Sequence, residues 1–153
     1  MPPKFQRNDQ FKQGVFKPKN PKKFLGKYAV FRSSYELKFF RWADENPNVL
    51  EWGSESVIVP YVSPIDGKVH RYYVDSFMAI REGDVIKKYL IELKPSKQML
   101  PPKVTKNKRA STLLYEQQTY IKNTAKWAAA REYAKKKGLE FIIITEKELF
   151  HRE

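Results

Sequence analysis

The chain has no cysteine and only two histidines. Without cysteine, disulfide bonds and thiolate zinc sites are excluded, and the composition is typical of cytoplasmic proteins. His70 and His151 have no partner at a metal-binding spacing, so we assign both to packing or surface roles. The chain also lacks any apolar run near the ~18 residues that a membrane-spanning helix needs, and its basic N-terminus lacks the apolar segment of a signal peptide.

Acidic residues are few beside the 30 Lys and Arg, and the formal net charge is +13. Residues 1–28 carry eight Lys or Arg and one Asp, a balance of +7. Residues 95–110 carry five Lys or Arg and no acid, a balance of +5, which leaves about +1 for the remainder. This pattern is typical of contact with a polyanion, most often nucleic acid. The alternative is a solvated basic tail that aids solubility.

An apolar content of 41% in 153 residues is enough for one folded domain with a buried core. Residues 1–28 mix Pro, Lys, Asn and Gln with isolated aromatics and have no sustained period. We therefore expect a basic extended arm there and a folded domain over residues 29–153. The phenylalanines of the arm can pin it to the domain, stack on bases or contact a partner, and the sequence leaves these alternatives open: Phe5, Phe11, Phe16 and Phe24.

The periodic segments follow the order helix, three strands, helix, strand. This order predicts an α/β (α+β) fold with a mixed central sheet flanked by helices. The first helix is expected over residues 34–46, because Ser33 is a good N-cap and Pro47 stops the helix. The first β segment is expected over residues 49–62, and the second over residues 72–80.

The second half of the chain is expected to hold one long helix over residues 111–137, with Gly138 as its C-terminal stop. Residues 139–145 have the composition of a buried strand that joins the sheet in parallel. Residues 146–150 are expected to form a short terminal helix. The core-facing side of the long helix is predicted from an apolar stripe of Leu114, Ile121, Ala125 and Ala128.

Two apolar strands are predicted to fold back on each other at Gly83 and Asp84. With these two as turn residues, Asp75 falls directly opposite Glu92, and cross-strand partners point to the same face of a sheet. Lys94, two residues after Glu92, points the same way. Like charges directly opposite destabilise a sheet unless something positive lies between them, and a divalent cation is the economical explanation. The alternative is an ion pair in which Lys94 neutralises one carboxylate at a strand end.

This set of residues suits phosphodiester hydrolysis, which needs a cation to polarise the phosphate and an activated water beside it. Two or three carboxylates bind Mg²⁺ through oxygen and leave positions for water and a phosphate oxygen. Asp75 and Glu92 supply the carboxylates, and the backbone carbonyl of Leu93 can add a ligand. Lys94 can orient the water or stabilise developing charge. We expect Mg²⁺, with Mn²⁺ as an alternative.

The candidate residues lie on successive elements, with Glu36 on the first helix, Asp75 on a strand and Glu92 on the next strand. Over residues 32–145 this order resembles the PD-(D/E)XK nuclease superfamily, whose restriction-endonuclease-like core is αβββαβ. The chain departs from the family pattern at Val74, which stands where the eponymous proline would lie. That proline is often absent in the family.

Similarity to the TnsA-like endonucleases lies in the segment FRSSYELKFFRWAD and the basic hairpin domain that follows it. The whole chain, including its basic arm, is similar to the head completion nucleases of T-even-like phages, notably in YVDSFMAI and YLIELKPSKQ. The resemblance implies a metal-dependent DNA nuclease, an endonuclease, an exonuclease or both, that acts on packaged DNA before the tail joins the head. It also implies a place in the cytoplasm of the infected bacterial host, or on the virion.

Glu36 has two interpretations. In related enzymes a glutamate on the first helix completes the metal site, and the resemblance implies this role for Glu36. The alternative is a capping box with Ser33, three residues earlier, which needs no metal. A glutamate that bonds back to the start of its own helix cannot also reach a cation.

Contacts with double-stranded DNA are expected from the basic loop after the hairpin and from one side of the long helix. Gln118 shares the stripe of Leu114 and Ile121, and in this superfamily a core-facing glutamine can position a nucleotide or the catalytic lysine. Otherwise it is simply half-buried. The candidate contacts are Lys97, Lys103, Lys106, Lys108, Arg109, Gln118, Lys122 and Lys126.

Two rival functions remain open. One is a non-catalytic, DNA-binding capsid or neck assembly protein that uses the basic arm to grip portal or neck proteins. The other is a site-specific endonuclease similar to a transposase subunit, which would leave a defined cut position. The sequence alone does not give cleavage polarity, oligomeric state or the partner of the arm.

Overall fold

The computed structural model describes residues 13–150 of the chain. Phe5, Phe11 and His151 therefore lie outside the described residues. In chain order the elements are β1 (Gly14–Phe16), η1 (Pro21–Lys23), β2 (Ala29–Phe31), α2 (Ser34–Glu45), β3 (Val49–Ser54), β4 (Ile58–Val62), β5 (Val69–Tyr73), β6 (Ser76–Glu82), β7 (Val85–Leu93), η2 (Ser96–Met99), α3 (Ala110–Lys137), β8 (Glu140–Ile144) and α4 (Glu146–Leu149).

The central sheet has four strands in the order β3-β6-β7-β8. The pairs β3–β6 and β6–β7 are antiparallel, whereas β7 and β8 are parallel and are joined through α3. With α2 before the first of these strands, the order is αβββαβ, so the predicted mixed sheet and its restriction-endonuclease-like core are confirmed. The expected helices around residues 34–46, 111–137 and 146–150 all form.

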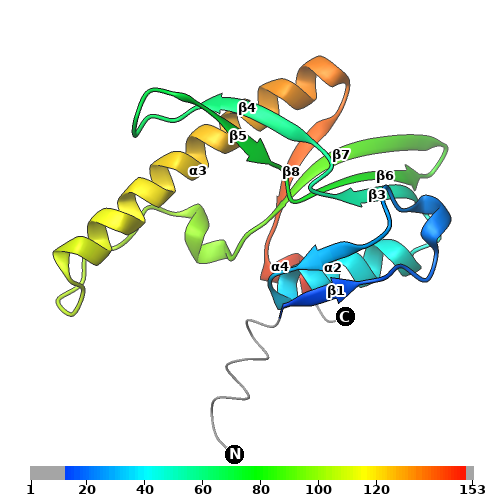
Figure 1. Ribbon diagram of the computed structural model, residues 1–153, viewed down its shortest axis with the longest axis horizontal. Coiled ribbons are helices and arrows are strands. Elements are labelled where there is room, and N and C mark those ends of the chain that lie inside the picture. Colours follow the sequence, from blue (N-terminus) through cyan, green and yellow to red (C-terminus); the bar gives the residue numbers. More distant parts are fainter. Residues whose placement is uncertain (1–12, 151–153) are drawn as a thin grey trace, which may run out of the picture.

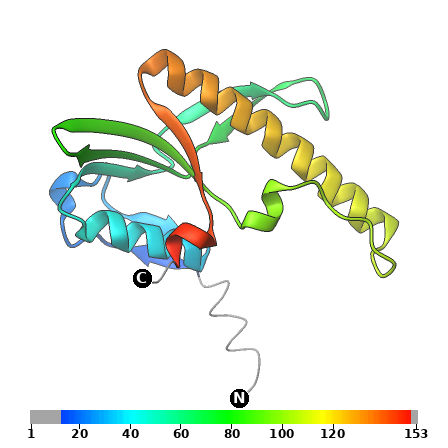
Figure 2. The same ribbon diagram turned by 180° about the vertical axis from the view of Figure 1, so that it is seen from behind.

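Two layers cover the sheet, and each has its own hydrophobic core (Figure 1). On one side α2, α4 and the β1–β2 pair pack around residues that include Phe39, Phe40 and Trp52. On the other side α3 and the β4–β5 hairpin pack around residues that include Tyr72, Leu90 and Trp127. The view from behind shows the same separation of α3 from α2 by the sheet (Figure 2).

The β4–β5 hairpin is an insertion that the sequence pattern did not reveal. Residues 49–62 were expected as one segment, but β3 ends at Ser54 and Glu55 takes a left-handed conformation with a φ of 53°. The chain then leaves the sheet and forms a separate two-stranded sheet. It returns at Asp75, whose carbonyl accepts a hydrogen bond from the Glu55 N–H at 3.1 Å. The segment 72–80 expected as one strand is therefore divided between β5 and β6.

The core-facing side predicted for α3 is wrong at Leu114, Ile121 and Ala128, whereas Ala125 packs against the core as predicted. Leu114 and Ile121 are 56% and 43% exposed. The helix buries a different set instead: Asn123, Trp127, Ala130 and Ala134. The helix has 28 residues and is longer than the sheet that it covers. Its first half therefore extends beyond the sheet, with the loop after η2 beside it (Figures 1 and 2). The predicted C-terminal stop is confirmed, since Gly138 is left-handed with a φ of 72°.

The second half of the expected arm, from Gly14 onward, packs against the domain. Strand β1 pairs with β2. The rings of Phe16 and Phe24 lie 6.0 and 4.6 Å, centroid to centroid, from the ring of Trp52. Of the alternatives for these two phenylalanines, pinning of the arm is therefore the one that the structure supports.

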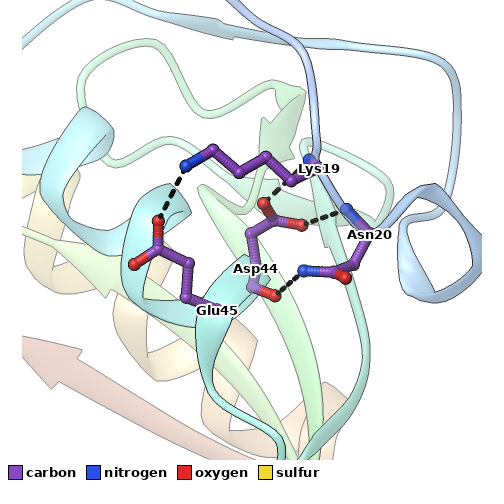
Figure 3. Close-up of polar contacts among 4 residues, drawn as sticks. All are labelled: Lys19, Asn20, Asp44 and Glu45. Carbon is purple, nitrogen blue, oxygen red and sulfur yellow. Dashed lines mark hydrogen bonds and ion pairs between the residues drawn. The ribbon is translucent and has the colours of Figure 1, made fainter.

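Asp44 anchors the same segment to the end of α2 (Figure 3). Its side chain is buried, and its carboxylate accepts hydrogen bonds from the backbone N–H groups of Lys19 (2.9 Å) and Asn20 (3.1 Å). The Asn20 amide donates in turn to the Asp44 carbonyl at 2.8 Å. Nearby, the exposed Lys19 ammonium lies 3.7 Å from Glu45. The buried charge therefore has a structural explanation, because its hydrogen bonds satisfy it.

Candidate active site

The register of the β6–β7 hairpin places the predicted carboxylates side by side. Glu82 pairs with Val85, and Ser76 pairs with Ile91, as the two-residue turn requires. Asp75 directly precedes Ser76 and Glu92 directly follows Ile91, so these two residues lie just beyond the last pair of the ladder, where the charge of Glu92 acts on Asp75. The register predicted from the turn is therefore confirmed.

Glu92 is buried and has two partners. The Tyr72 hydroxyl donates a hydrogen bond to its Oε1 at 2.5 Å, and the Lys94 Nζ lies 3.3 Å from its Oε2. Tyr72 comes from the inserted hairpin, and Lys94 directly follows β7. The ion pair between Lys94 and Glu92 is thus present, but it neutralises one carboxylate of the pair.

Asp75 has no such cation beside it among the described residues. Its Oδ2 accepts a hydrogen bond from the Leu93 N–H at 2.8 Å. Burial raises the pKa of Asp75 well above its ordinary value, and the charges of Glu92 and Glu36 raise it further. The Leu93 hydrogen bond and Lys94 act in the opposite direction. The site therefore holds more negative charge than its own lysine balances, which is the electrostatic condition for binding a cation.

The donor set fits a hard divalent cation. Asp75 and Glu92 offer carboxylate oxygens, and Mg²⁺ is commonly bound through one or two carboxylates while it keeps several waters. Within residues 13–150, no group of three His, Asp or Glu side chains lies close enough to hold a metal ion by itself. A cation here would rest mainly on Asp75 and Glu92.

Glu36 lies near this pair and also stabilises the start of its own helix. Ser33 caps α2 by accepting from the Glu36 N–H at 3.2 Å. The Glu36 carboxylate accepts from the N–H of Arg32, where a capping box would use that of Ser33. Burial raises the pKa of Glu36, and the charges of Glu55 and Glu92 add to this, whereas Arg32 lowers it. Both interpretations of Glu36 thus have a physical basis.

Arg32 and Glu55 are neighbours of the site that the sequence did not indicate. The Arg32 guanidinium lies 2.6 Å from the Glu55 carboxylate, and the pair raises the pKa of Arg32. Glu55 is also the left-handed residue that bonds to the Asp75 carbonyl. The pair links the start of α2 to the base of the inserted hairpin. Tyr72 was missed as well, because it had been interpreted only as an apolar strand residue.

Most of the basic loop is exposed, as DNA contact requires, but Lys108 has an internal role. Its Nζ lies 2.7 Å from Glu116 and donates to the Lys103 carbonyl at 2.7 Å. It thereby ties the loop to α3 and is less free to meet a phosphate. Loop and helix enclose a cleft of about 720 Å³. The exposed basic residues of this region are Lys97, Lys103, Lys106 and Arg109.

On α3 the three candidates differ. Gln118 is exposed, so the core-facing position on which its role was argued is wrong. Lys122 and Lys126 are half-buried on the part of the helix nearer the sheet. Lys126 lies above the rings of Tyr61 and Tyr72, with its Nζ 5.9 and 5.6 Å from the two centroids. It therefore belongs to the surroundings of Glu92.

Comparison with known proteins identifies the family. Residues 46–146 match the family described as TnsA-like endonuclease N terminal. The chain belongs to this family. It is also 38% identical over 141 residues to the head completion nuclease of Enterobacteria phage T4, an alignment that covers 87% of this chain and 90% of that protein. The TnsA-like match spans the whole β3–β8 sheet, including Asp75, Glu92 and Lys94. The predicted nuclease family is therefore confirmed.

The structure also bears on membrane association. Among the described residues, none of the helices has the length and apolar content needed to cross a bilayer.

Proposed function

We propose that the protein is a Mg²⁺-dependent DNA nuclease that hydrolyses phosphodiester bonds during completion of the phage head. The observation that carries this proposal is the buried, like-charged pair Asp75 and Glu92 with Lys94 beside it, in a chain of the TnsA-like endonuclease family. Nothing in the packing of the sheet requires two carboxylates at this position, and their mutual repulsion costs stability in the absence of a cation.

The proposed roles follow from the position of each residue. Asp75 and Glu92 hold the cation, the Leu93 carbonyl adds a ligand, and Glu36 completes the set when its bond to Arg32 opens. When bound, Mg²⁺ supplies the positive charge that polarises the phosphodiester and makes a nearby water more acidic. Lys94, held by Glu92, orients the attacking water. Mn²⁺ fits the same oxygen donors and is expected to substitute.

The biological step is proposed from the relative. The head completion nuclease of phage T4 aligns with 87% of this chain, so a similar role in head completion is supported. We propose that this step also serves head-tail joining. It would act on double-stranded DNA in the cytoplasm of the infected bacterium or on the virion. We further propose that the basic arm, residues 1–28, contacts DNA or portal and neck proteins while the nuclease domain, residues 29–153, carries the site.

Cleavage of plasmid DNA tests the proposal. Wild type with Mg²⁺ or Mn²⁺ should cleave, and EDTA should abolish cleavage. Asp75→Ala and Lys94→Ala should each lose about 10²-fold or more in rate. If wild type and both variants leave the DNA equally intact, the protein is a non-catalytic assembly factor. Sequencing of the ends distinguishes a defined cut position, as a transposase-like endonuclease would give, from unspecific cleavage.

A further inference from the structure

Lys126 approaches the active site from α3, which covers the same side of the sheet as the β4–β5 hairpin that carries Tyr72. It lies on α3, whereas the carboxylates come from the β6–β7 hairpin. Its Nζ is 5.6 Å from the ring centroid of Tyr72, and the hydroxyl of that tyrosine donates to Glu92. Glu92 is in turn paired with Lys94. The order of contact is therefore Lys126, Tyr72, Glu92 and Lys94, so Lys126 is linked to the buried carboxylate through Tyr72.

In the part of the chain that the structure describes, the Lys126 ammonium group forms no salt bridge. Among residues 13–150, no carboxylate oxygen lies within 4.0 Å of Lys126 Nζ, although the side chain is half-buried. The two tyrosine rings beneath it supply a cation–π contact, which is weaker than a salt bridge to a desolvated carboxylate. Burial lowers the pKa of Lys126, and the nearby charges of Lys94 and Lys122 lower it further, against the effect of Glu92 and Asp75.

Glu92 is the nearest source of negative charge for both Lys126 and Lys94, and its carboxylate is already paired with Lys94, so an anionic group of a substrate can complete the arrangement at Lys126. Asp75 and Glu92 suit a cation. The anion that fits beside them is one that contacts this cation and the lysine ammonium groups at the same time. A phosphodiester group of DNA has this property, and lysine is a common point-charge ligand of phosphate. Nothing in the hydrophobic core beneath requires a charge at position 126, since Trp127, Ala130 and Ala134 make the packing of α3.

We propose that Lys126 is a catalytic residue that binds a non-bridging oxygen of the scissile phosphate, from α3, while Lys94 acts from strand β7. This inference rests on the proposed function and goes beyond general contact with the DNA backbone. In the reaction, the oxygen of a water adds to phosphorus and the water gives up a proton, one P–O ester bond breaks, and the departing alkoxide takes up a proton, so that a phosphomonoester and an alcohol are formed. Lys126 gives and takes no proton. It stabilises the negative charge that grows on the phosphoryl oxygens, so it acts more strongly on the transition state than on bound DNA.

The test compares Lys126→Met, which removes the charge and keeps the apolar stem, with Lys126→Arg, which keeps the charge. Lys136→Met is the matched control, because it removes an exposed charge from the same helix far from Glu92. Single-turnover cleavage at saturating plasmid DNA with Mg²⁺ gives the rate, and binding with Ca²⁺ in place of Mg²⁺ gives the affinity. Thermal unfolding verifies that each variant is folded.

We expect Lys126→Met to cleave about 100-fold more slowly while its affinity changes less than about threefold. Lys126→Arg should recover part of the rate, and Lys136→Met should match wild type. The proposal is overturned if Lys126→Met cleaves at the wild-type rate, or if its loss is entirely one of affinity. Should Lys126→Met unfold, a folded Lys126→Arg as inactive as Asp75→Ala would also overturn it. Inactivity of wild type itself would contradict the proposed function instead.

Discussion

At the scale of single residues, the site is defined by two carboxylates that the fold holds close together although they repel each other. Asp75 and Glu92 meet because the turn at Gly83 fixes the hairpin register. Tyr72 and Lys94 hold one carboxylate in place, and the Leu93 N–H holds the other. Their geometry is thus set before any substrate arrives, which is the condition for efficient electrostatic catalysis.

The stability of the metal-free protein should depend on pH through Asp75. The pKa of Asp75 is raised in the folded state above its value in the unfolded chain, about 3.9, so folding strengthens proton binding. The stability that this proton contributes is lost as pH rises from about 4 through the raised pKa. Urea unfolding in EDTA should therefore give a lower free energy of unfolding at pH 8 than at pH 5, by about 1.4 kcal/mol for each pH unit of this window that lies between the two measurements.

Asp75→Asn removes this titration. The variant should be more stable than wild type in EDTA at pH 8, and its free energy of unfolding should fall less between pH 5 and pH 8. Added Mg²⁺ should stabilise wild type and leave the variant nearly unchanged. The reason is that a ligand stabilises the folded state only when its concentration exceeds its Kd for that state. An identical pH dependence in the two proteins would contradict the prediction.

Glu36→Gln separates the two interpretations of Glu36. Glutamine keeps an oxygen that can accept from the Arg32 N–H, so the start of α2 should lose less than about 0.5 kcal/mol. If the carboxylate is a metal ligand, cleavage should fall about 100-fold and the Mg²⁺ concentration for half-maximal rate should rise. Cleavage assays over a range of Mg²⁺ measure both. A fully active Glu36→Gln would leave only the capping role.

At the scale of elements, the segment that follows β7, the strand of Glu92, is tied to α4 through the carboxylate of Glu146. Glu146 of α4 accepts from the Ser96 backbone N–H at 2.8 Å and from the Ser96 hydroxyl. These hydrogen bonds lower the pKa of Glu146 to about 2. Since Ser96 follows Lys94 by two residues, α4 holds the end of the catalytic strand.

Glu146→Ala should therefore affect catalysis from outside the site. At pH values above about 4.3, the ordinary pKa of a glutamate, the hydrogen bonds that Glu146 accepts contribute to the stability of the fold. This contribution is lost as the pH falls through about 2. We expect Glu146→Ala to lower the cleavage rate about tenfold through displacement of Lys94, with little change in DNA affinity. Glu148→Ala, on the same helix but without a bond to Ser96, is the control. Equal losses of cleavage rate in the two variants would contradict this prediction, because they would show that the rate depends on the stability of α4 and not on the bond between Glu146 and Ser96.

The anchor at Asp44 predicts a second effect at this scale. Asp44→Asn replaces one acceptor oxygen with an amide that cannot accept from a backbone N–H, so a buried donor loses its partner. We expect a loss of about 1–3 kcal/mol in the free energy of unfolding by urea. The exposed neighbour offers a control, since Glu45→Gln breaks only a surface ion pair worth about 0.5 kcal/mol. A similar small loss for both variants would contradict the prediction.

At the scale of the whole molecule, the basic loop after η2 lies beside the part of α3 that extends from the sheet (Figure 1), and most of its Lys and Arg side chains are exposed. Binding to DNA should weaken steeply with salt and depend little on sequence, because lysine contacts phosphates and carries little base readout. Replacing Lys103, Lys106 and Arg109 with alanine should lower the slope of log affinity against log salt by about 0.9 for each phosphate that is no longer neutralised. Fluorescence anisotropy with Ca²⁺ measures this slope.

A control for this prediction lies at the other end of the same helix. Replacing Lys135, Lys136 and Lys137 with alanine changes the net charge by the same amount. Its slope should remain near that of wild type if the loop provides the phosphate contacts. Equal slopes for the two triple variants would indicate that net charge alone governs binding.

The sequence predicted what depends on local rules and missed what depends on distant contacts. Turn residues and strand alternation place Asp75 opposite Glu92, and a capping residue and a proline bound α2. The insertion of β4 and β5 was missed because alternation looks the same in a second sheet. The buried side of α3 was missed because half of that helix has nothing to cover it. Tyr72 and Lys126 lie far from Glu92 in sequence, and no local pattern brings them to it.

The base of the inserted hairpin has an evolutionary consequence. The Glu55 N–H bonds to the Asp75 carbonyl and the Val74 N–H bonds to the Val57 carbonyl, both at 3.1 Å, so the insertion is closed where it leaves the sheet. The turn between β4 and β5 can therefore gain or lose residues without moving the catalytic strands. As long as Tyr72 is kept, the length of this turn can therefore vary in the course of evolution while Asp75, Glu92 and Lys94 keep their places.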